Sequence, residues 1–468
     1  MADSRFAALR FLQRKWPLIQ KVSFFLAVVL IALFLTQVLR SDEMSTPAVN
    51  ALFLLLFAAG LWISEAIPPF AVSILVIGYS MYFLDSIDLM IVSKDWERYV
   101  STWSSPIIWI LIGGFFLAMG AQVTAFDRKF SHFVLRYFGN RPYNILLGCM
   151  LVTGVLSMFM SNTATTAMMV AILAPIIQQV DRKDPLVKAV FLGVAAAATV
   201  GGMGTVIGSP PNAIALGIIQ NQGIPFGFSQ WMLAGVPIAF VSIFGIWLVL
   251  KNHYKTQYER LELQANSVTP VISQRVQQRY RFIVVATFAV TVGLWLTSTL
   301  HSIPVAVVSF LPIVSFTVTG VVRAEDLRLL PWDTLILVAG GLTLGMVISD
   351  TGLATHIVSG IPVFNNVVVM LLIMGWLTTF LSNIMSNTAA ASILIPVGSS
   401  FLPDHSLLIS VVIGLSASTA LFLPISTPPN AIAFSTGYLK QSDFRLLGLL
   451  VGLGGPVLIS LIVIFFYL

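Results

Sequence analysis

The stretch of sequence that decides the fold is MSNTATTAMM, which runs from Met160 to Met169. Its uncharged polar residues begin with Ser161, Asn162 and Thr163, inside a chain that is otherwise strongly apolar. The letters MSNTA return from Met385 to Ala389. Ser, Asn and Thr are typical of a helix N-terminus, where their side chains accept hydrogen bonds from free backbone N–H groups. One copy indicates an ordinary helix cap, but two copies at equivalent places in a repeat predict a binding site.

The composition is that of a protein that crosses a membrane several times. Of 468 residues, 57% are hydrophobic and 9% are charged, whereas roughly 25% of residues in soluble domains are charged. Apolar runs near the bilayer-spanning length of about 20 residues recur along the chain. The sequence lacks the alternation of apolar and polar residues that is typical of membrane β-barrel strands. We therefore expect an all-α polytopic membrane protein, with Val22–Leu39 as an uncleaved first span.

The basic residues predict which loops face the cytoplasm, because Lys and Arg accumulate on that side of a membrane. The net charge is +6, and most Lys and Arg residues lie in the N-terminal tail and a few loops. These loops are 127–141, 181–188, 251–281, 323–328 and 440–445. The pattern predicts a cytoplasmic N-terminus and an external C-terminus, in the inner (plasma) membrane of a bacterium. It argues against a nucleic-acid partner.

Threading the apolar runs through these loops gives about eleven transmembrane helices and two re-entrant hairpins, each with an SNT triplet at its tip. The first hairpin, 143–180, has basic residues at both ends and is expected to enter from the cytoplasm. The second, 366–402, lacks them and is expected to enter from outside. Five crossings lie between the hairpins. Because five is odd, the second copy is predicted to be inverted relative to the first.

The duplication extends beyond the hairpins. SPPNAIA at 209–215 matches TPPNAIA at 427–433, and LIGGFFLAMG at 111–120 resembles LVAGGLTLGM at 337–346. Both halves therefore have the same order: a GG helix, an SNT hairpin and a helix broken at a proline pair. Inverted repeats with interrupted helices at corresponding positions indicate the binding site of a secondary transporter.

These features predict five regions along the chain. They are N-terminal scaffold helices at 1–102, a first inverted repeat at 103–220 with its broken helix at 186–220, scaffold spans at 221–327 with a cytoplasmic linker at 251–281, a second inverted repeat at 328–438 with its broken helix at 405–438, and a last span at 439–468.

The repeated motifs suit ions of both signs. A proline inside a helix leaves unpaired the carbonyl four residues earlier, which predicts free carbonyls near Val206 and Ile207 and at the equivalent positions of the second repeat. Such carbonyls, with Ser and Asn oxygens, suit a small cation such as Na⁺. The helix that starts at each SNT tip offers free N–H groups and a positive dipole end, which suit a carboxylate.

No ionisable residue lies near either SNT or PPN motif in the sequence. An anion held by neutral groups at low dielectric needs a compensating charge, and bound Na⁺ supplies one. Glu65 and Asp333 lie near the cytoplasmic ends of spans, so we expect them to have topological or structural roles.

The paired SNT motifs, each followed by a PPN break, resemble the divalent anion–sodium symporter family, which carries dicarboxylates, citrate and sulfate. The resemblance covers roughly Trp103–Tyr438. It implies a homodimer with scaffold domains and transport domains that move as an elevator. The first Na⁺ site that it implies comprises Ser157, Ser161, Asn162 and the Gly208 carbonyl, and the second comprises Ser382, Ser386, Asn387 and the Ser426 carbonyl. The implied substrate ligands are Asn162, Thr163, Ser209, Asn387, Thr388 and Thr427.

The leading hypothesis is Na⁺-coupled uptake of a C4 dicarboxylate such as succinate, malate or fumarate, with at least two Na⁺ sites. The alternatives are a Na⁺-independent dicarboxylate exchanger and a citrate or sulfate carrier of the same fold. An anion channel has no need of two inverted cation sites and is less favoured. The sequence shows no nucleophile–base set or metal cluster typical of an enzyme.

Overall fold

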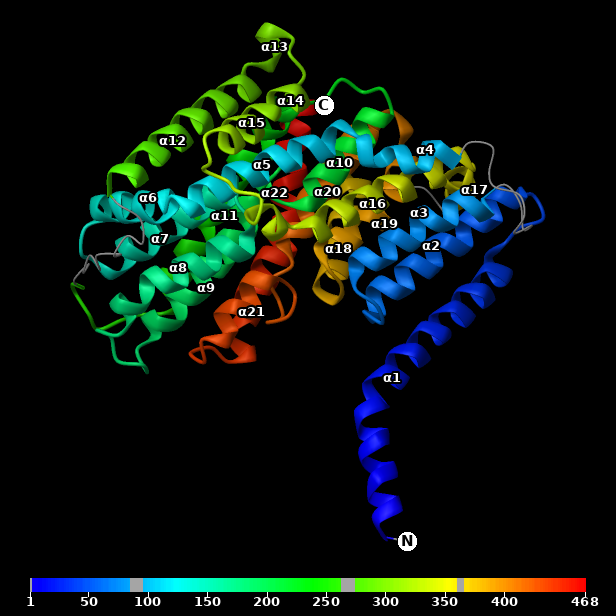
Figure 1. Cartoon of the computed structure of the whole chain (residues 1–468), viewed down its shortest axis with the longest axis horizontal. Helices are drawn as coiled ribbons and strands as arrows, with labels where there is room; N and C mark the ends of the chain where they lie inside the picture. The colour runs from blue at the N-terminus through cyan, green and yellow to red at the C-terminus, as the bar shows by residue number, and fades with distance from the viewer. Residues whose placement is uncertain (1, 85–95, 262–273, 360–365) are drawn as a thin grey trace.

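The computed structural model describes residues 2–84, 96–261, 274–359 and 366–468, and within these ranges every regular element is a helix (Figure 1). Nine helical segments of the described chain are long and apolar enough to cross a membrane. The expected all-α polytopic fold is therefore confirmed.

Two of the expected spans are short. Helix α3 (Pro69–Phe83) has 15 residues, about 22 Å at 1.5 Å per residue, whereas the hydrocarbon core is about 30 Å thick. The span after residue 303 is split into α14 (Val305–Val308) and α15 (Phe310–Val318). The count of eleven crossings stays a prediction.

The N-terminal helices form a group at one side of the molecule. Helix α1 (Ala2–Leu39) leads away from the rest of the chain and contacts α2 (Thr46–Ser64) near its C-terminal end (Figure 1). Helices α2 and α3 pack together, and α3 lies against α16 (Trp332–Asp350). This contact requires a glycine at position 340, because a Cβ atom there would lie only 2.3 Å from the Ser73 Cβ atom.

The remaining elements follow the order that the sequence repeat predicts. After α4 (Trp96–Val100) and η1 (Ser101–Ser104), the first copy comprises α5 (Pro106–Val123), α6 (Phe126–Leu135), η2 (Arg136–Phe138), α7 (Pro142–Ser157), α8 (Asn162–Ile177), α9 (Pro185–Gly201), η3 (Gly202–Gly204), α10 (Pro210–Asn221) and α11 (Phe228–His253). The middle of the chain forms α12 (Gln274–Leu296), α13 (Ser298–His301), α14, α15 and η4 (Asp326–Leu329). The second copy comprises α16, α17 (Leu353–Ser359), α18 (Val367–Ile384), α19 (Asn387–Phe401), η5 (Pro403–His405), α20 (Ser406–Ser416), η6 (Ala417–Thr419), α21 (Pro428–Ser435), η7 (Gln441–Asp443) and α22 (Phe444–Tyr467).

The two copies interlock. Helix α10, which follows the first break, packs against α19 and α20 of the other copy, while α21 packs against α8 and α9. Helices α11 and α22 lie beyond the predicted repeats at 103–220 and 328–438 but also occupy matching places, since α11 packs against α7 and α9, and α22 packs against α18 and α20. The repeat in sequence is thus a repeat in packing. Its inversion across the membrane and the boundaries of scaffold and transport domains stay predictions.

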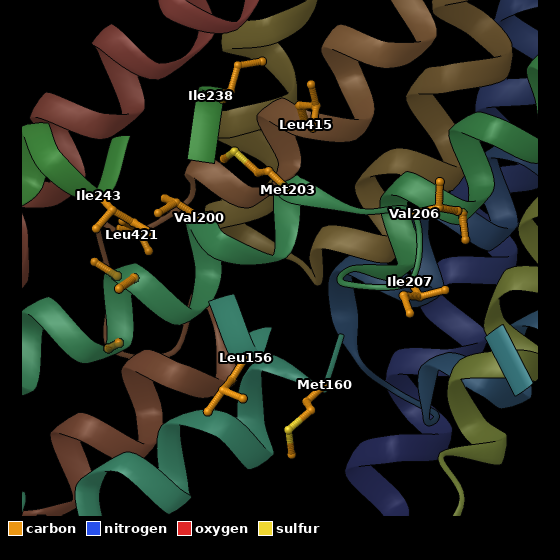
Figure 2. Close-up of a cluster of buried hydrophobic side chains, with 14 of the residues drawn as sticks. Leu156, Met160, Val200, Met203, Val206, Ile207, Ile238, Ile243, Leu415 and Leu421 are labelled. Carbon is orange, nitrogen blue, oxygen red and sulfur yellow. The ribbon is translucent and has the colours of Figure 1, made fainter. Parts of the chain in front are cut away.

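Apolar side chains anchor the break between α9 and α10. Figure 2 shows Met203, Val206 and Ile207 along this segment, and all three are buried. The Met203 carbonyl accepts a hydrogen bond of 3.0 Å from Trp231 Nε1 on α11. Ile207 lies against Gly114 of the GG helix α5, where a Cβ atom would come within 2.8 Å of the isoleucine side chain. The non-helical backbone is therefore fixed by packing on two sides.

The copies differ where the first hairpin arm meets the broken helix. In the first copy the two backbones are in contact. A Cβ atom at Gly201 would lie 2.5–2.9 Å from backbone atoms of Gly154, which leaves no room for a side chain. The corresponding residues of the second copy are Thr379 and Thr419, whose hydroxyl oxygens lie 2.6 Å apart in a hydrogen bond. The first contact depends on two glycines, and the second on two hydroxyls.

We expect Gly201→Ala to destabilise the protein, because its methyl group has to push α7 and α9 apart. Overpacking of this kind costs about 1–3 kcal/mol. The measurement is the midpoint of thermal unfolding of the purified protein in detergent. The control is Gly245→Ala in α11, where nothing lies within 4 Å of the added Cβ atom. A midpoint for Gly201→Ala equal to that of the control would contradict the close contact.

Candidate functional site

Each SNT triplet starts a helix, as its composition predicts. Ser161 is the N-cap of α8 and its Oγ accepts a hydrogen bond of 3.1 Å from the Ala164 N–H. Ser386 is the N-cap of α19 and accepts one of 3.2 Å from the Ala389 N–H. Both serine hydroxyls therefore act as helix caps, and the following Asn and Thr lie in the first turn, where N–H groups are free.

A cluster of oxygen atoms surrounds the amide group of Asn162. Its Oδ1 lies 2.5 Å from Ser157 Oγ, and Ser157 Oγ donates a hydrogen bond of 2.7 Å to the Ala198 carbonyl. The same amide atom lies 3.2 Å from the carbonyl oxygens of both Ala198 and Gly208. Two carbonyls, a hydroxyl and an amide thus converge on one point from α7, α8, α9 and the break before α10.

Four converging oxygens repel one another unless a hydrogen or a cation lies between them. Turning the Asn162 amide over places its N–H₂ against the carbonyls and satisfies them. A small cation satisfies them with the amide oxygen turned inward, since Na⁺ and similar hard cations take carbonyl and hydroxyl ligands. The oxygens of the cluster can therefore be satisfied either by the amide N–H₂ or by a small cation.

Glycines leave the space for this cluster. A Cβ atom at Gly202 would lie 2.8 Å from Asn162 Oδ1 and 2.9 Å from the Gly208 carbonyl oxygen. A Cβ atom at Gly208 would lie 2.6 Å from the Gly202 carbonyl oxygen. Neither position accepts a side chain without displacing the oxygens.

The corresponding atoms of the second copy are buried and unpaired. Ser382 Oγ and Asn387 Oδ1 both lack a hydrogen-bond partner among the described residues. A buried polar atom without a partner costs about 1–3 kcal/mol, and a bound ion is one way to recover it. These two oxygens belong to the second Na⁺ site that the family resemblance implies.

The prolines take a different role from the expected one. Pro210 and Pro211 lie in the first turn of α10, and Pro428 and Pro429 in the first turn of α21. Proline is well tolerated there, because the N–H groups of the first turn have no helical partner. The expectation that proline pairs free carbonyls within a helix was therefore wrong, and the carbonyls at the first oxygen cluster are those of Ala198 and Gly208.

The asparagine of each PPN motif satisfies the backbone of the break. Asn212 Nδ2 donates hydrogen bonds of 2.9 and 2.7 Å to the carbonyls of Gly202 and Thr205. Asn430 Nδ2 donates bonds of 3.3 and 3.0 Å to the carbonyls of Leu421 and Leu423. Both side chains are buried. They fold the unwound segments back on themselves and so hold the breaks in place.

Both tips and both breaks face one cavity of about 890 Å³. All of the site residues expected from the sequence line it except Ser157 and Ser382, which are buried behind the tips. Those that line it are Ser161, Asn162, Thr163, Gly208, Ser209, Ser386, Asn387, Thr388, Ser426 and Thr427. Residues more than 200 positions apart in sequence thus meet at one place.

The charged residues in the cavity lining are both acidic. They are Glu65, at the C-terminal end of α2, and Asp333, in the first turn of α16. Both are exposed, and no Lys, Arg or His belongs to the described lining. The sequence assigned topological or structural roles to both carboxylates, but the fold brings them to the cavity. An anion in this cavity therefore meets no cationic side chain from the described lining residues.

Several further residues of the site were not foreseen from the sequence. Besides the Ala198 carbonyl and Gly202, they include Thr205, whose hydroxyl donates to the Met158 carbonyl and accepts from the Gly208 N–H at 3.1 Å. Asn383 also lines the cavity. The PPN repeat carried a signal for Asn212 and Asn430, because asparagine follows both proline pairs.

Comparisons with known proteins place this chain among transporters. The sequence model of the family described as "Citrate transporter" matches residues 59–412. The chain is 30% identical over 461 residues to the sodium-dependent dicarboxylate transporter SdcS of Staphylococcus saprophyticus, covering 91% of this chain and 87% of that one. It is 29% identical to the sodium-dependent dicarboxylate transporter SdcS of Staphylococcus aureus strain USA300, and the alignment covers 92% of this chain and 88% of that one.

Solved structures with the same fold belong to transporters. Neisseria gonorrhoeae MtrF, from a class of antimetabolite efflux pumps, aligns with a TM-score of 0.55 at 11% identity, covering 92% of this chain and 96% of that one. The YdaH transporter of Alcanivorax borkumensis aligns with a TM-score of 0.54 at 13% identity, covering 90% and 98%. At these identities the likeness concerns the fold alone.

We expect Gly202→Ala to weaken cation binding while the protein still folds, because the methyl group displaces Asn162 Oδ1 and the Gly208 carbonyl. Changes next to metal ligands typically cost about tenfold or more in affinity. The measurement is the Na⁺ concentration that half-saturates thermal stabilisation of the purified protein. Gly454→Ala in α22, with nothing within 4 Å of its Cβ atom, is the control. An unchanged Na⁺ response in Gly202→Ala would exclude a cation from this cluster.

Proposed function

The chain belongs to the citrate transporter family, and we propose that it is a secondary active transporter that couples Na⁺ entry to the uptake of a C4 dicarboxylate such as succinate, malate or fumarate. The observation that carries this proposal is the convergence of the Asn162 amide, the Ser157 hydroxyl and the Ala198 and Gly208 carbonyl oxygens on one point. The names of the SdcS relatives support both the dicarboxylate and the dependence on sodium.

The two cations of the proposal bind behind the tips. The first is held by Ser157, Ser161, Asn162 and the Gly208 carbonyl, together with the Ala198 carbonyl that lies 2.7 Å from Ser157 Oγ. The second is held by Ser382, Ser386, Asn387 and the Ser426 carbonyl. The unpaired, buried oxygens of Ser382 and Asn387 support this placement.

The dicarboxylate of the proposal lies in the cavity between the tips. Each Asn amide has its oxygen available for Na⁺ and its N–H₂ for a carboxylate. Thr163 and Ser209 bind one carboxylate beside Asn162, and Thr388 and Thr427 bind the other beside Asn387. The positive ends of α8 and α19 stabilise both charges.

Charge balance makes the coupling obligatory in this scheme. Since the charged groups of the described lining are the carboxylates of Glu65 and Asp333, the dianion needs bound cations for compensation. The same carboxylates disfavour citrate, whose third charge adds repulsion. The two cations and the dianion then cross the membrane together, and their charges nearly cancel.

The movement that carries these ions is proposed to be an elevator motion of the two hairpins and broken helices against a scaffold, in a homodimer within the inner membrane. The interlocked packing of α10 with α19 and α20, and of α21 with α8 and α9, supports a single moving body. In this scheme the repeats are inverted, the N-terminus is cytoplasmic and the C-terminus is external.

We expect purified protein in proteoliposomes to accumulate labelled succinate only when an inward Na⁺ gradient is imposed, because both cation sites must fill before the anion is held. The matched control replaces Na⁺ by choline on both sides. Uptake that persists in choline and requires internal succinate would instead identify an exchanger. Citrate or sulfate competing better than malate and fumarate would identify the other carriers of the family.

We expect Asn162→Asp and Asn387→Asp each to abolish succinate uptake in correctly inserted protein. Aspartate keeps an oxygen for Na⁺ but loses the N–H₂ donors, and it adds a negative charge beside the substrate. At about 4 Å and an effective dielectric constant near 20, that repulsion is about 4 kcal/mol before screening, and each 1.4 kcal/mol is tenfold in affinity.

The matched control for these variants is Asn221→Asp. Asn221 is exposed at the end of α10 and does not belong to the cavity lining, so this variant should transport normally. Near-normal uptake by either tip variant would mean that the SNT triplet is a helix cap and nothing more.

A further inference from the structure

We propose that Asn383 is a positioning residue that ties the unwound segment of the second repeat to α18 and thereby sets the affinity of the second cation site. The inference rests on the proposed function, because it concerns one of its two Na⁺ sites. Asn383 lies near the C-terminal end of α18, one residue after Ser382, and lines the cavity.

Three hydrogen bonds hold the amide of Asn383 in place. Its Nδ2 donates to the Thr379 carbonyl at 2.9 Å, one turn earlier in α18. Its Oδ1 accepts from the Phe422 N–H at 3.0 Å and from Ser426 Oγ at 2.8 Å. Phe422 and Ser426 lie at the two ends of the segment between η6 and α21. One side chain therefore clamps both ends of the break.

The geometry assigns Asn383 a positioning role and not that of a cation ligand. An amide oxygen has two lone pairs, and Oδ1 of Asn383 already accepts two hydrogen bonds. Ser382 Oγ and Asn387 Oδ1, on either side of it in the sequence, find no hydrogen-bond partner in the described part of the chain. The oxygens open to a cation and the oxygen that holds the loop are thus different atoms.

The tie reaches the cation site through Ser426. The Ser426 hydroxyl donates to Asn383 Oδ1 and accepts from the Leu423 N–H at 3.1 Å, so its side chain is fixed on the α18 side of the break. The main-chain carbonyl of the same residue is the ligand that this segment contributes to the second site. Fixing the side chain therefore fixes where that carbonyl points, much as an outer partner orients a metal ligand.

The first repeat makes the same tie with other groups. The residue that corresponds to Asn383 is Met158, whose side chain has no amide, and there Thr205 Oγ1 donates to the Met158 main-chain carbonyl. Thr205 also accepts from the N–H of Gly208, the residue that corresponds to Ser426. Both breaks are thus tied to the end of the hairpin arm before the tip, but only the second tie runs through a side chain of that arm, which mutation can remove.

The test is a Na⁺ titration of thermal stability on the purified full-length protein in detergent, with choline chloride keeping the ionic strength constant. We expect Asn383→Ala to raise the half-saturating Na⁺ concentration about tenfold. Asn383→Asp keeps acceptors for Phe422 and Ser426 and should stay at or below the wild-type value. Ser426→Ala keeps the carbonyl ligand but loses the tie, and should match Asn383→Ala.

The matched control is Asn366→Ala. It changes the same residue type on the same helix, where Asn366 caps the N-terminus of α18 by accepting from the Val369 N–H at 3.2 Å. This variant should lower thermal stability without moving the half-saturating Na⁺ concentration, as any merely structural loss in α18 would.

The outcomes separate the two proposals. A wild type that Na⁺ does not stabilise relative to choline overturns both the Na⁺ coupling and the role of Asn383. A wild type that responds to Na⁺, with Asn383→Ala and Ser426→Ala responding identically to it, overturns only the role of Asn383. An equal rise in Asn383→Ala and Asn383→Asp would show that the acceptor of the tie is not the cause.

Discussion

The structure depends on one constraint, that unwound backbone inside a membrane must find its hydrogen bonds within the protein. Each unsatisfied group there costs several kcal/mol. Asn212 and Asn430 meet this constraint by donating to two carbonyls each within their own break. The Gly208 carbonyl of the first break faces the oxygen cluster around Asn162. The proposed first cation site therefore lies beside a break whose backbone is held by Asn212.

The absence of a basic side chain from the described cavity lining determines how the site works with an anion. A fixed Arg or Lys would hold a carboxylate at all times and remove any need for a cation. In the proposed scheme the compensating charge is a bound cation, so the affinities for cation and anion are linked, and each raises the other by the same factor. The acidic Glu65 and Asp333 strengthen that dependence, because they disfavour an anion that arrives alone. The proposed coupling thus follows from the charges of the described cavity lining.

Short local motifs made much of this site predictable from the sequence. The SNT and PPN letters mark helix starts and breaks by chemistry that acts within a few residues, and their duplication showed that the two places belong together. The Ala198 carbonyl and the Asn383 tie were not predictable, because they depend on which helices touch. The place of Glu65 in the cavity lining was not predictable for the same reason, since it reaches the cavity from a helix outside both repeats. The sequence predicts that the proline pairs interrupt helices. In the structure the preceding helix has already ended, and the prolines lie in the first turn of the next helix.

The two halves share a path of the chain but not a set of contacts. In the first half, Gly154 and Gly201 let two backbones come into contact. In the second half, the side chains of Thr379 and Thr419 stand between the corresponding backbones and are joined by a hydrogen bond. In the first half, where the helices are in contact, Ser157 Oγ reaches the Ala198 carbonyl at 2.7 Å. In the second half, the corresponding Ser382 Oγ finds no partner among the described residues. The first oxygen cluster is therefore organised by the packing of its helices, while the second relies on the hydrogen bonds of Asn383 for its shape. The sequence similarity between the repeats consequently predicts where each site lies. How rigidly the site is held depends on the side chains between its helices, which differ between the repeats.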